Sequence, residues 1–186
     1  TALHLLLTGI AINALCLSGV GFLSYIARDP QARSISFWNM GALSGANWSN
    51  VAIVGIACVV GLLISLRFAK DLNALVLGED DAAFLGVDVR RLKWLVLGTN
   101  VLMIAIATSF VGVIAFVGLI VPHILRISKE SDHRFLISHA AVLGAIVLVL
   151  ADLVARILVK PAELPIGVVT SLVGAPLFLL LLRRNR

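Results

Sequence analysis

The feature that most constrains this chain is a set of long apolar stretches without formal charge. The first, Leu3 to Ala27, has 25 residues and no Asp, Glu, Lys or Arg. As an α-helix it would be about 37 Å long, more than the roughly 30 Å hydrocarbon core of a bilayer. The chain is 60% hydrophobic and 13% charged, whereas soluble domains are about 25% charged. We therefore predict an all-α integral membrane protein, a polytopic helical bundle, and exclude a soluble enzyme, a disordered chain and a disulfide-stapled secreted domain.

A second apolar run predicts a broken helix. Residues 94–125 are uncharged for 32 positions, which would make a straight helix of about 48 Å, too long for one span. The possible break points are Gly112, Gly118 and Pro122. We predict a full helix to about Gly112, a tight turn, and a short returning half-span that ends near Ser128.

Shorter or interrupted helices are predicted in the rest of the chain. The last apolar run is cut by Gly174 and Pro176, so we predict a half-helix over 166–173 and a terminal helix over 175–182. The other expectations are a helix over 34–43 within a polar connector at 28–50, a span over 51–66 completed by flanks 47–50 and 67–69, and a span over 135–159. This gives six membrane-crossing segments, two of them short or broken.

The basic residues predict which loops face the cytoplasm. Eleven of the fifteen Lys and Arg residues fall on one side, in residues 67–93, residues 126–134 and the C-terminal tail. The other side holds Arg28, Arg33, Arg156 and Lys160. Cytoplasmic loops carry the excess of Lys and Arg, so we predict a cytoplasmic loop at 71–92 and an outer, periplasmic connector at 28–50.

The sequence contains no recognisable catalytic constellation. None of its four His residues forms an HExxH pair, and there is no Walker-type glycine loop. His123 follows Pro122. We interpret it as a helix histidine that is hydrogen-bonded to a backbone carbonyl, in preference to a ligand or a proton carrier. Cys16 and Cys58 fall inside apolar runs, so we interpret them as small buried hydrophobes without a disulfide.

Two charged residues interrupt an apolar helix. Asp152 and Arg156 are four positions apart, the spacing of an intrahelical ion pair. An ionisable residue inside a span also raises a functional hypothesis, and both interpretations stay open. By its distance from Phe135, Arg156 can reach the outer surface and meet a partner's carboxylate.

The polar loop at 71–92 predicts a docking element. Glu79, Asp80 and Asp81 would complement the positive end of a short helix over 80–85, and Gly86 suits a left-handed C-cap. That helix shows Ala82, Phe84 and Leu85 between two basic clusters. The alternative is an ordinary amphipathic loop packed on its own membrane domain.

Several stretches together resemble a known family. They are LGEDDAAFLGVDVRR (77–91), GVIAFVGLIVPHILR (112–126), SDHR (131–134), ADLVAR (151–156), AELPIGVVTSLVGAPLFLLLL (162–182) and the connector RSISFWNMGALSGANW (33–48). In this order and spacing they resemble the permease subunit of bacterial ABC importers for iron–siderophore, haem and vitamin B12, the FecCD type. The resemblance implies a ten-helix permease of which this single transmembrane domain, 1–186, is the second half, about helices 5–10. The opening at Thr1 inside an apolar run fits that expectation.

The resemblance also implies sites, partners and cofactors. A cytoplasmic ATP-binding cassette ATPase, which holds ATP and Mg, would contact Leu77, Gly78, Glu79, Ala82, Leu85, Gly86 and Val87. Arg156 would help to dock a periplasmic or lipid-anchored substrate-binding protein. The translocation path would be lined by Thr8, Ala11, Ile12 and Leu15. A second permease copy would complete a homodimer in the membrane lipid, and no nucleic acid, resident cofactor or metal is expected.

The implied function is import of an iron complex, haem or a ferric siderophore, across the bacterial inner membrane by alternating access. The subunit itself would have no catalytic site. Vitamin B12 import is the nearest alternative. An ion-coupled secondary transporter is another, because such carriers use broken helices and intramembrane acids. An intramembrane enzyme would need a catalytic pair that the sequence does not show, and a simple membrane anchor would not explain the helix breaks.

Overall fold

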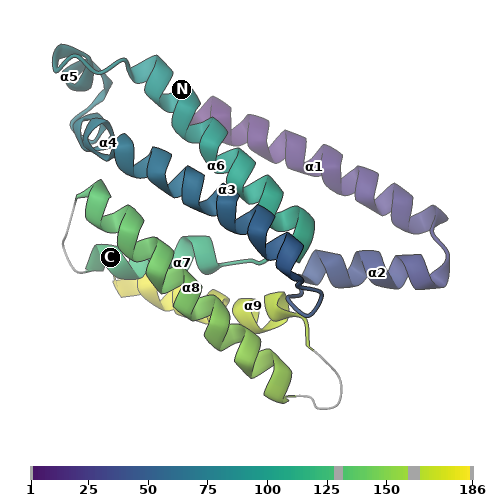
Figure 1. The fold of residues 1–186 in the computed structure, drawn as a ribbon. Coiled ribbons are helices and arrows are strands. Elements are labelled where there is room, and N and C mark those ends of the chain that lie inside the picture. Colours follow the sequence, from purple (N-terminus) through teal and green to yellow (C-terminus); the bar gives the residue numbers. More distant parts are fainter. Residues whose placement is uncertain (1, 128–131, 159–163, 185–186) are drawn as a thin grey trace. The chain divides into compact units, whose positions relative to one another are not determined.

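The computed structural model describes residues 2–127, 132–158 and 164–184, and every regular element among them is an α-helix (Figure 1). The predicted half-span end at Ser128, the loop at 129–131, Lys160 and Arg186 lie outside these residues. The chain forms two compact units, Thr1–Asn39 and Met40–Arg186. Each unit is described by itself.

The first unit holds α1 (Ala2–Ile26) and nearly all of α2 (Asp29–Met40). The long helix predicted over Leu3 to Ala27 is confirmed, and its side chains are almost all exposed. The connector helix was predicted over 34–43 but begins and ends earlier. It begins earlier because Asp29 suits a helix N-terminus and Pro30 is tolerated in the first turn. It ends at Met40 because Gly41, at φ +69°, leaves the helical conformation.

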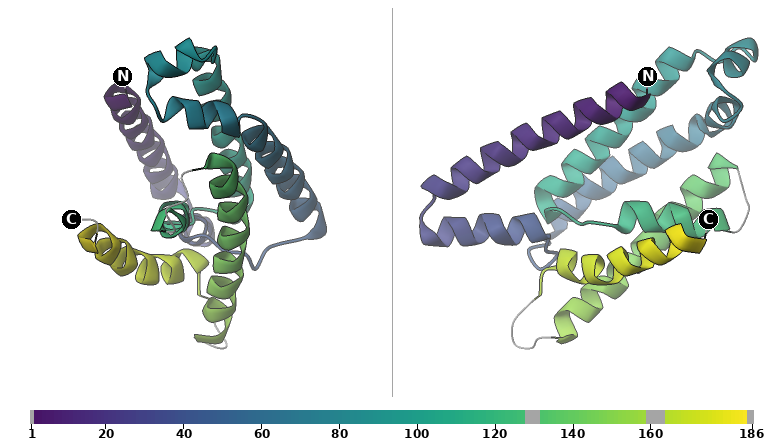
Figure 2. Two further views of the ribbon diagram at one scale, coloured as in Figure 1. Left: turned by 90° about the vertical axis from the view of Figure 1, so that its left-hand side faces the viewer. Right: turned by 180° about the vertical axis from the view of Figure 1, so that it is seen from behind.

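The second unit opens with two long helices packed side by side, α3 (Trp48–Arg67) and α6 (Val89–Val111), joined by two short ones, α4 (Ala69–Leu75) and α5 (Glu79–Phe84) (Figures 1 and 2). The side chain of Asn47 accepts a hydrogen bond from the backbone N–H of Asn50 at 2.8 Å, which caps α3. Gly61 of α3 lies against the Met103 side chain of α6, where a β-carbon would overlap it. The two helices therefore approach closely at Gly61.

The predicted break after α6 is confirmed. Gly112 has φ +78° and ends α6, and its N–H donates to the carbonyl of Thr108 at 2.8 Å. After a short irregular stretch, α7 (Val117–Ile127) runs back along the unit (Figure 1). Phe116, just before α7, also has positive φ, +68°. The 32-residue apolar run is thus one full helix and one short helix, as its length requires.

The core lies where α7, α8 (His133–Leu158) and α9 (Ile166–Arg184) meet (Figure 2). Its most buried side chains include Val121 of α7, Ala155 of α8 and Ile166 of α9. The break predicted in the last run is wrong, because α9 is continuous and Pro176 lies inside it. A proline removes one backbone donor, and membrane helices accommodate that loss through neighbouring helices and local adjustment.

The helices divide by length as a membrane protein requires. α1, α3, α6 and α8 are long and apolar enough to span a membrane, and two shorter apolar helices cover 117–126 and 166–180. The chain is therefore a multi-pass membrane protein. Cys16 and Cys58 are free thiols, but both are exposed rather than buried. Apolar positions of a membrane helix need no cover from the same chain, since lipid or other helices can cover them.

Candidate coupling and docking sites

A short, well-capped segment joins α4 to α6, and we call residues 76–87 the coupling segment. Gly78, at φ +124°, precedes α5. At the other end Gly86, at φ +86°, donates its N–H to the carbonyl of Ala83, and Val87 donates to that of Ala82, both at 3.0 Å. These two bonds form a Schellman motif, which confirms the left-handed C-cap predicted at Gly86. The backbone of α5 is thus capped at its C-terminal end.

Electrostatics tie the coupling segment to α6. Glu79, Asp80 and Asp81 all lie in the first turn of α5, where negative charge is favourable. The Glu79 carboxylate pairs with the Lys93 ammonium of α6 at 2.5 Å. The hydrogen bond from Lys93, and then its positive charge, lower the pKa of Glu79 below its ordinary value. Glu79 is therefore ionised at neutral pH.

The coupling segment exposes large apolar side chains in an otherwise polar region. Leu77 is 65% exposed, Leu85 66% and Phe84 89%. Of the other residues predicted to contact a partner, Gly78, Glu79 and Gly86 are exposed and Val87 is half-buried. Ala82 is fully buried, so its side chain packs within this chain and is not available for contact with a partner. Clustered exposed apolar groups mark interaction surfaces.

Sequence reasoning left Phe84 off the set of predicted contact residues, although it is the most exposed large side chain of the coupling segment. An aromatic residue inside an acidic loop was the available signal.

Another set of residues holds α4 against the start of α8. The Asn73 amide nitrogen donates to Asp132 Oδ1 at 2.8 Å. Asn73 Oδ1 accepts from the backbone N–H of His133 at 2.8 Å and lies 2.7 Å from His133 Nδ1. Asp132 Oδ1 also accepts the Arg134 N–H at 2.9 Å, and the Asn73 amide, ahead of this backbone bond, lowers the pKa of Asp132. Sequence reasoning missed Asn73, because its partners are 59 and 60 positions away.

Near the other end of α8, Asp152 and Arg156 form the ion pair that their spacing predicted. Arg156 Nε donates to Asp152 Oδ2 at 2.7 Å. The arginine side chain is half-exposed, whereas the aspartate is about one quarter exposed. The pairing offsets the cost of each charge in an apolar helix and leaves the arginine side chain accessible.

The residues predicted to line a path share one face of α1. Thr8, Ala11, Ile12 and Leu15 recur at helical spacing and are all exposed within their unit. The Thr8 hydroxyl donates to the carbonyl of His4 at 2.8 Å, so its polar group is already satisfied by the helix backbone. The face therefore presents mainly apolar surface.

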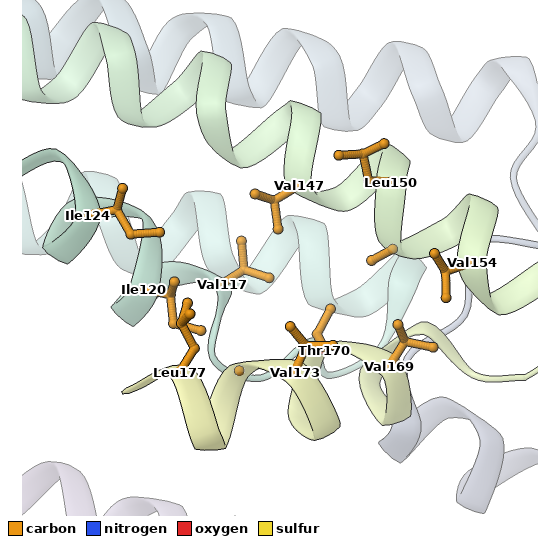
Figure 3. Close-up of a pocket in the computed structure, with 12 residues that line it drawn as sticks. Val117, Ile120, Ile124, Val147, Leu150, Val154, Val169, Thr170, Val173 and Leu177 are labelled. Atoms are coloured by element: carbon orange, nitrogen blue, oxygen red, sulfur yellow. The ribbon is translucent and has the colours of Figure 1, made fainter. Parts of the chain in front are cut away.

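A groove of about 310 Å³ lies among α7, α8 and α9 (Figure 3). Its lining is apolar apart from Thr170, whose hydroxyl donates to the carbonyl of Gly167 at 3.2 Å. Nearby, the His123 ring meets the Phe178 ring edge-on, with centroids 6.4 Å apart. Across residues 2–127, 132–158 and 164–184 no cluster of three His, Cys, Asp or Glu residues could hold a metal ion.

These features describe a multi-pass helical membrane domain with exposed apolar side chains on one of its loops. The chain belongs to the FecCD transport family, whose model matches residues 1–184. The family expected from the sequence is thereby confirmed.

Curated relatives cover the chain almost completely. The hemin transport system permease protein of Yersinia pestis is 46% identical over 183 residues, 98% of this chain and 55% of that protein. The cobalamin import system permease protein of Halobacterium salinarum is 43% identical, over 96% of this chain and 48% of that protein. The chain thus spans about half the length of the curated relatives it matches.

A solved structure confirms the fold. A metal-chelate type ABC transporter in an inward-facing conformation superposes with a TM-score of 0.93 at 35% identity. The match covers 98% of this chain and 59% of the solved chain. The predicted permease fold is therefore confirmed for this part of the molecule.

Proposed function

We propose that this chain is the second half of the permease subunit of an ATP-driven importer in the bacterial cytoplasmic (inner) membrane. Its cargo is an iron complex, haem or a ferric siderophore, moved by alternating access. The 46% identity to a hemin permease supports this substrate class. The 43% identity to a cobalamin permease makes vitamin B12 the second candidate cargo.

The observation that carries the proposal is the exposed apolar edge of the coupling segment. The proposed contacts with a separate ATPase subunit are Leu77, Gly78, Glu79, Leu85, Gly86 and Val87, joined by Phe84, with Ala82 holding α5 from within. The C-terminal cap of α5 and the Glu79–Lys93 pair suit this role. A helix held in place transmits a displacement that a flexible loop would absorb. The ATPase would supply ATP and Mg, and the permease half needs no cofactor or metal of its own.

The remaining partners follow from the other surfaces. Arg156, accessible near the end of α8, would pair with an acidic residue of a periplasmic or lipid-anchored binding protein. The α1 face of Thr8, Ala11, Ile12 and Leu15 would border the path between two permease copies of a homodimer. An apolar face without ligand groups suits a bulky chelate that is passed through rather than coordinated.

A pull-down of the full-length permease in gentle detergent tests the ATPase contact. Phe84→Asp should weaken co-purification of the ATPase by roughly 30-fold, the effect of losing a central apolar anchor. The matched control is Phe37→Asp, the same change at an exposed phenylalanine of α2, and it should leave recovery unchanged. The proposal would be contradicted if Phe84→Asp recovered as much ATPase as the unaltered protein, or if the unaltered protein recovered no ATPase.

A further inference from the structure

Asn73 makes a set of contacts unlike most others in the chain. Most side-chain hydrogen bonds of the described residues join positions no more than four apart, whereas the bonds of Asn73 span 59 and 60 positions. Asn73 lies in α4, directly before the coupling segment, and its partners are His133, the first residue of α8, and Asp132, the residue before it. One side chain thus links two helices that are remote in the sequence.

The amide uses both of its ends, so its orientation is defined. Its nitrogen donates to Asp132, and its oxygen faces two groups of His133. Since that oxygen only accepts, His133 Nδ1 must carry a proton. Asp132 is also the residue whose carboxylate accepts the Arg134 N–H at the start of α8. Asn73 therefore contacts the N-cap residue and the first residue of α8.

α8 extends from the Asn73 hydrogen bonds to the proposed docking site. From His133 to Arg156 the helix is uninterrupted, a length of about 34 Å at 1.5 Å per residue. The Asp152–Arg156 pair is near its far end. The helix packs against α3, α4, α7 and α9 along this length, so that it joins the two regions as one continuous element.

We infer that Asn73 is a positioning residue that makes α4 and α8 move together, so that displacement of the coupling segment reaches the docking end of α8. The inference rests on the proposed function. Asn73 lies outside the proposed ATPase contacts, and its amide is engaged by Asp132 and His133. Its loss should uncouple the two ends of the protein while both partners still bind.

The test uses the full-length permease with its ATPase and binding protein in proteoliposomes. The readout is the amount of probe imported per ATP hydrolysed, with haemin and cobalamin as probes, because poor folding lowers yield but not this ratio. Asn73→Ala should lower the ratio about tenfold, within the usual range of coupling energies, and leave ATPase co-purification unchanged. The control is Asn100→Ala on α6, whose amide bonds to the Val96 carbonyl of its own helix, and its ratio should equal that of the unaltered protein.

Exchanging the side chains of residues 73 and 132 distinguishes an effect of their hydrogen bond from an effect on the overall stability of the protein. Asn73→Asp alone sets two carboxylates against each other and should uncouple. Combining it with Asp132→Asn again sets one amide donor against one carboxylate acceptor, with the donor now at position 132, and the ratio should recover. A normal ratio for Asn73→Ala, or no recovery in the exchanged pair, would overturn the inference alone. Failure of the unaltered complex to use ATP for import would overturn the proposed function as well.

Discussion

At the scale of single residues, a junction of backbone groups organises the second unit. The N–H of Ile166, at the start of α9, donates to the carbonyl of Gly41 at 3.0 Å. The N–H of Ala42 donates to the carbonyl of Val111 at 2.8 Å. Gly167 lies so close to the Met40 carbonyl that a side chain would overlap it. A buried helix start needs partners for its free N–H groups, and here another segment's backbone supplies one.

Gly41→Ala tests this junction. The alanine would have to adopt φ +69°, and its β-carbon would lie 2.6 Å from the Val113 carbonyl oxygen. The unfolding free energy should fall by about 1–3 kcal/mol, seen as a lower thermal midpoint of the purified full-length protein. Gly144→Ala in α8, where nothing lies within 4 Å, should be neutral or slightly stabilising. Equal midpoints for the two variants would show that the junction does not constrain Gly41.

The Glu79–Lys93 pair makes a pH-dependent prediction. A carboxylate with a lowered pKa stabilises the fold above its unfolded value, near 4.5, and that contribution is lost as the pH falls through the lowered folded pKa. The attachment of α5 should therefore not change between about pH 6 and 8. Carboxyl carbon NMR should place the Glu79 midpoint below 4.5, and Lys93→Ala should raise it. If the Glu79 titration midpoint is the same in Lys93→Ala as in the unaltered protein, the Glu79–Lys93 pair does not form.

At the scale of elements, the long helices followed from the sequence, but the bounds of α2 and the continuity of α9 did not. Long apolar runs, the last of them interrupted by Asp152 and Arg156, predicted α1, α3, α6 and α8, because hydropathy over about 20 residues is a strong signal. The continuity of α9 could not be predicted, since whether Pro176 breaks a helix depends on neighbours that satisfy the freed carbonyl. Gly174, suspected as a break, instead gives Phe116 room, because a β-carbon added at Gly174 would lie 2.6 Å from that of Phe116.

The candidate site was predictable where it depends on local pattern. The helix over 80–85 and its cap at Gly86 follow from acidic residues and a glycine at the right spacing. The burial of Ala82 and the bonds of Asn73 depend on packing between remote segments. No pattern within α4 indicates that its asparagine meets residues 132 and 133.

Substitutions in α9 should show whether Pro176 or the close packing at Gly174 contributes more to the stability of the protein. Gly174→Val should lower the unfolding free energy by about 1–3 kcal/mol, because it forces extra volume against Phe116. Pro176→Ala restores a backbone donor within a continuous helix and should leave stability equal or higher. Thermal midpoints in the same detergent compare the two. A larger loss for Pro176→Ala than for Gly174→Val would mean that the proline, and not the glycine, shapes α9.

At the scale of the whole molecule, the two proposed contact regions lie toward the two ends of α8. Asn73 holds its first turn, and the Asp152–Arg156 pair lies near its last. Such an arrangement suits a protein that must relay an event at one membrane face to the other. It agrees with membership of a transport family.

Arg156→Glu should weaken binding of the substrate-binding protein to the full-length permease about tenfold or more, because an attractive charge pair becomes repulsive. Co-purification of the ATPase should be unaffected. Arg33→Glu, the same charge reversal at an exposed arginine of α2, serves as the matched control in a surface-binding assay. If both variants bind equally well, Arg156 does not dock the binding protein.

Measuring which energy source drives import tests the central claim most directly. The full-length permease, its ATPase and its binding protein are reconstituted in liposomes, and uptake of haemin and of cobalamin is followed. We expect uptake of one probe that requires ATP on the ATPase side and binding protein on the other, and that ionophores do not abolish. Uptake driven by a proton or sodium gradient without ATP would contradict the claim and would favour an ion-coupled carrier.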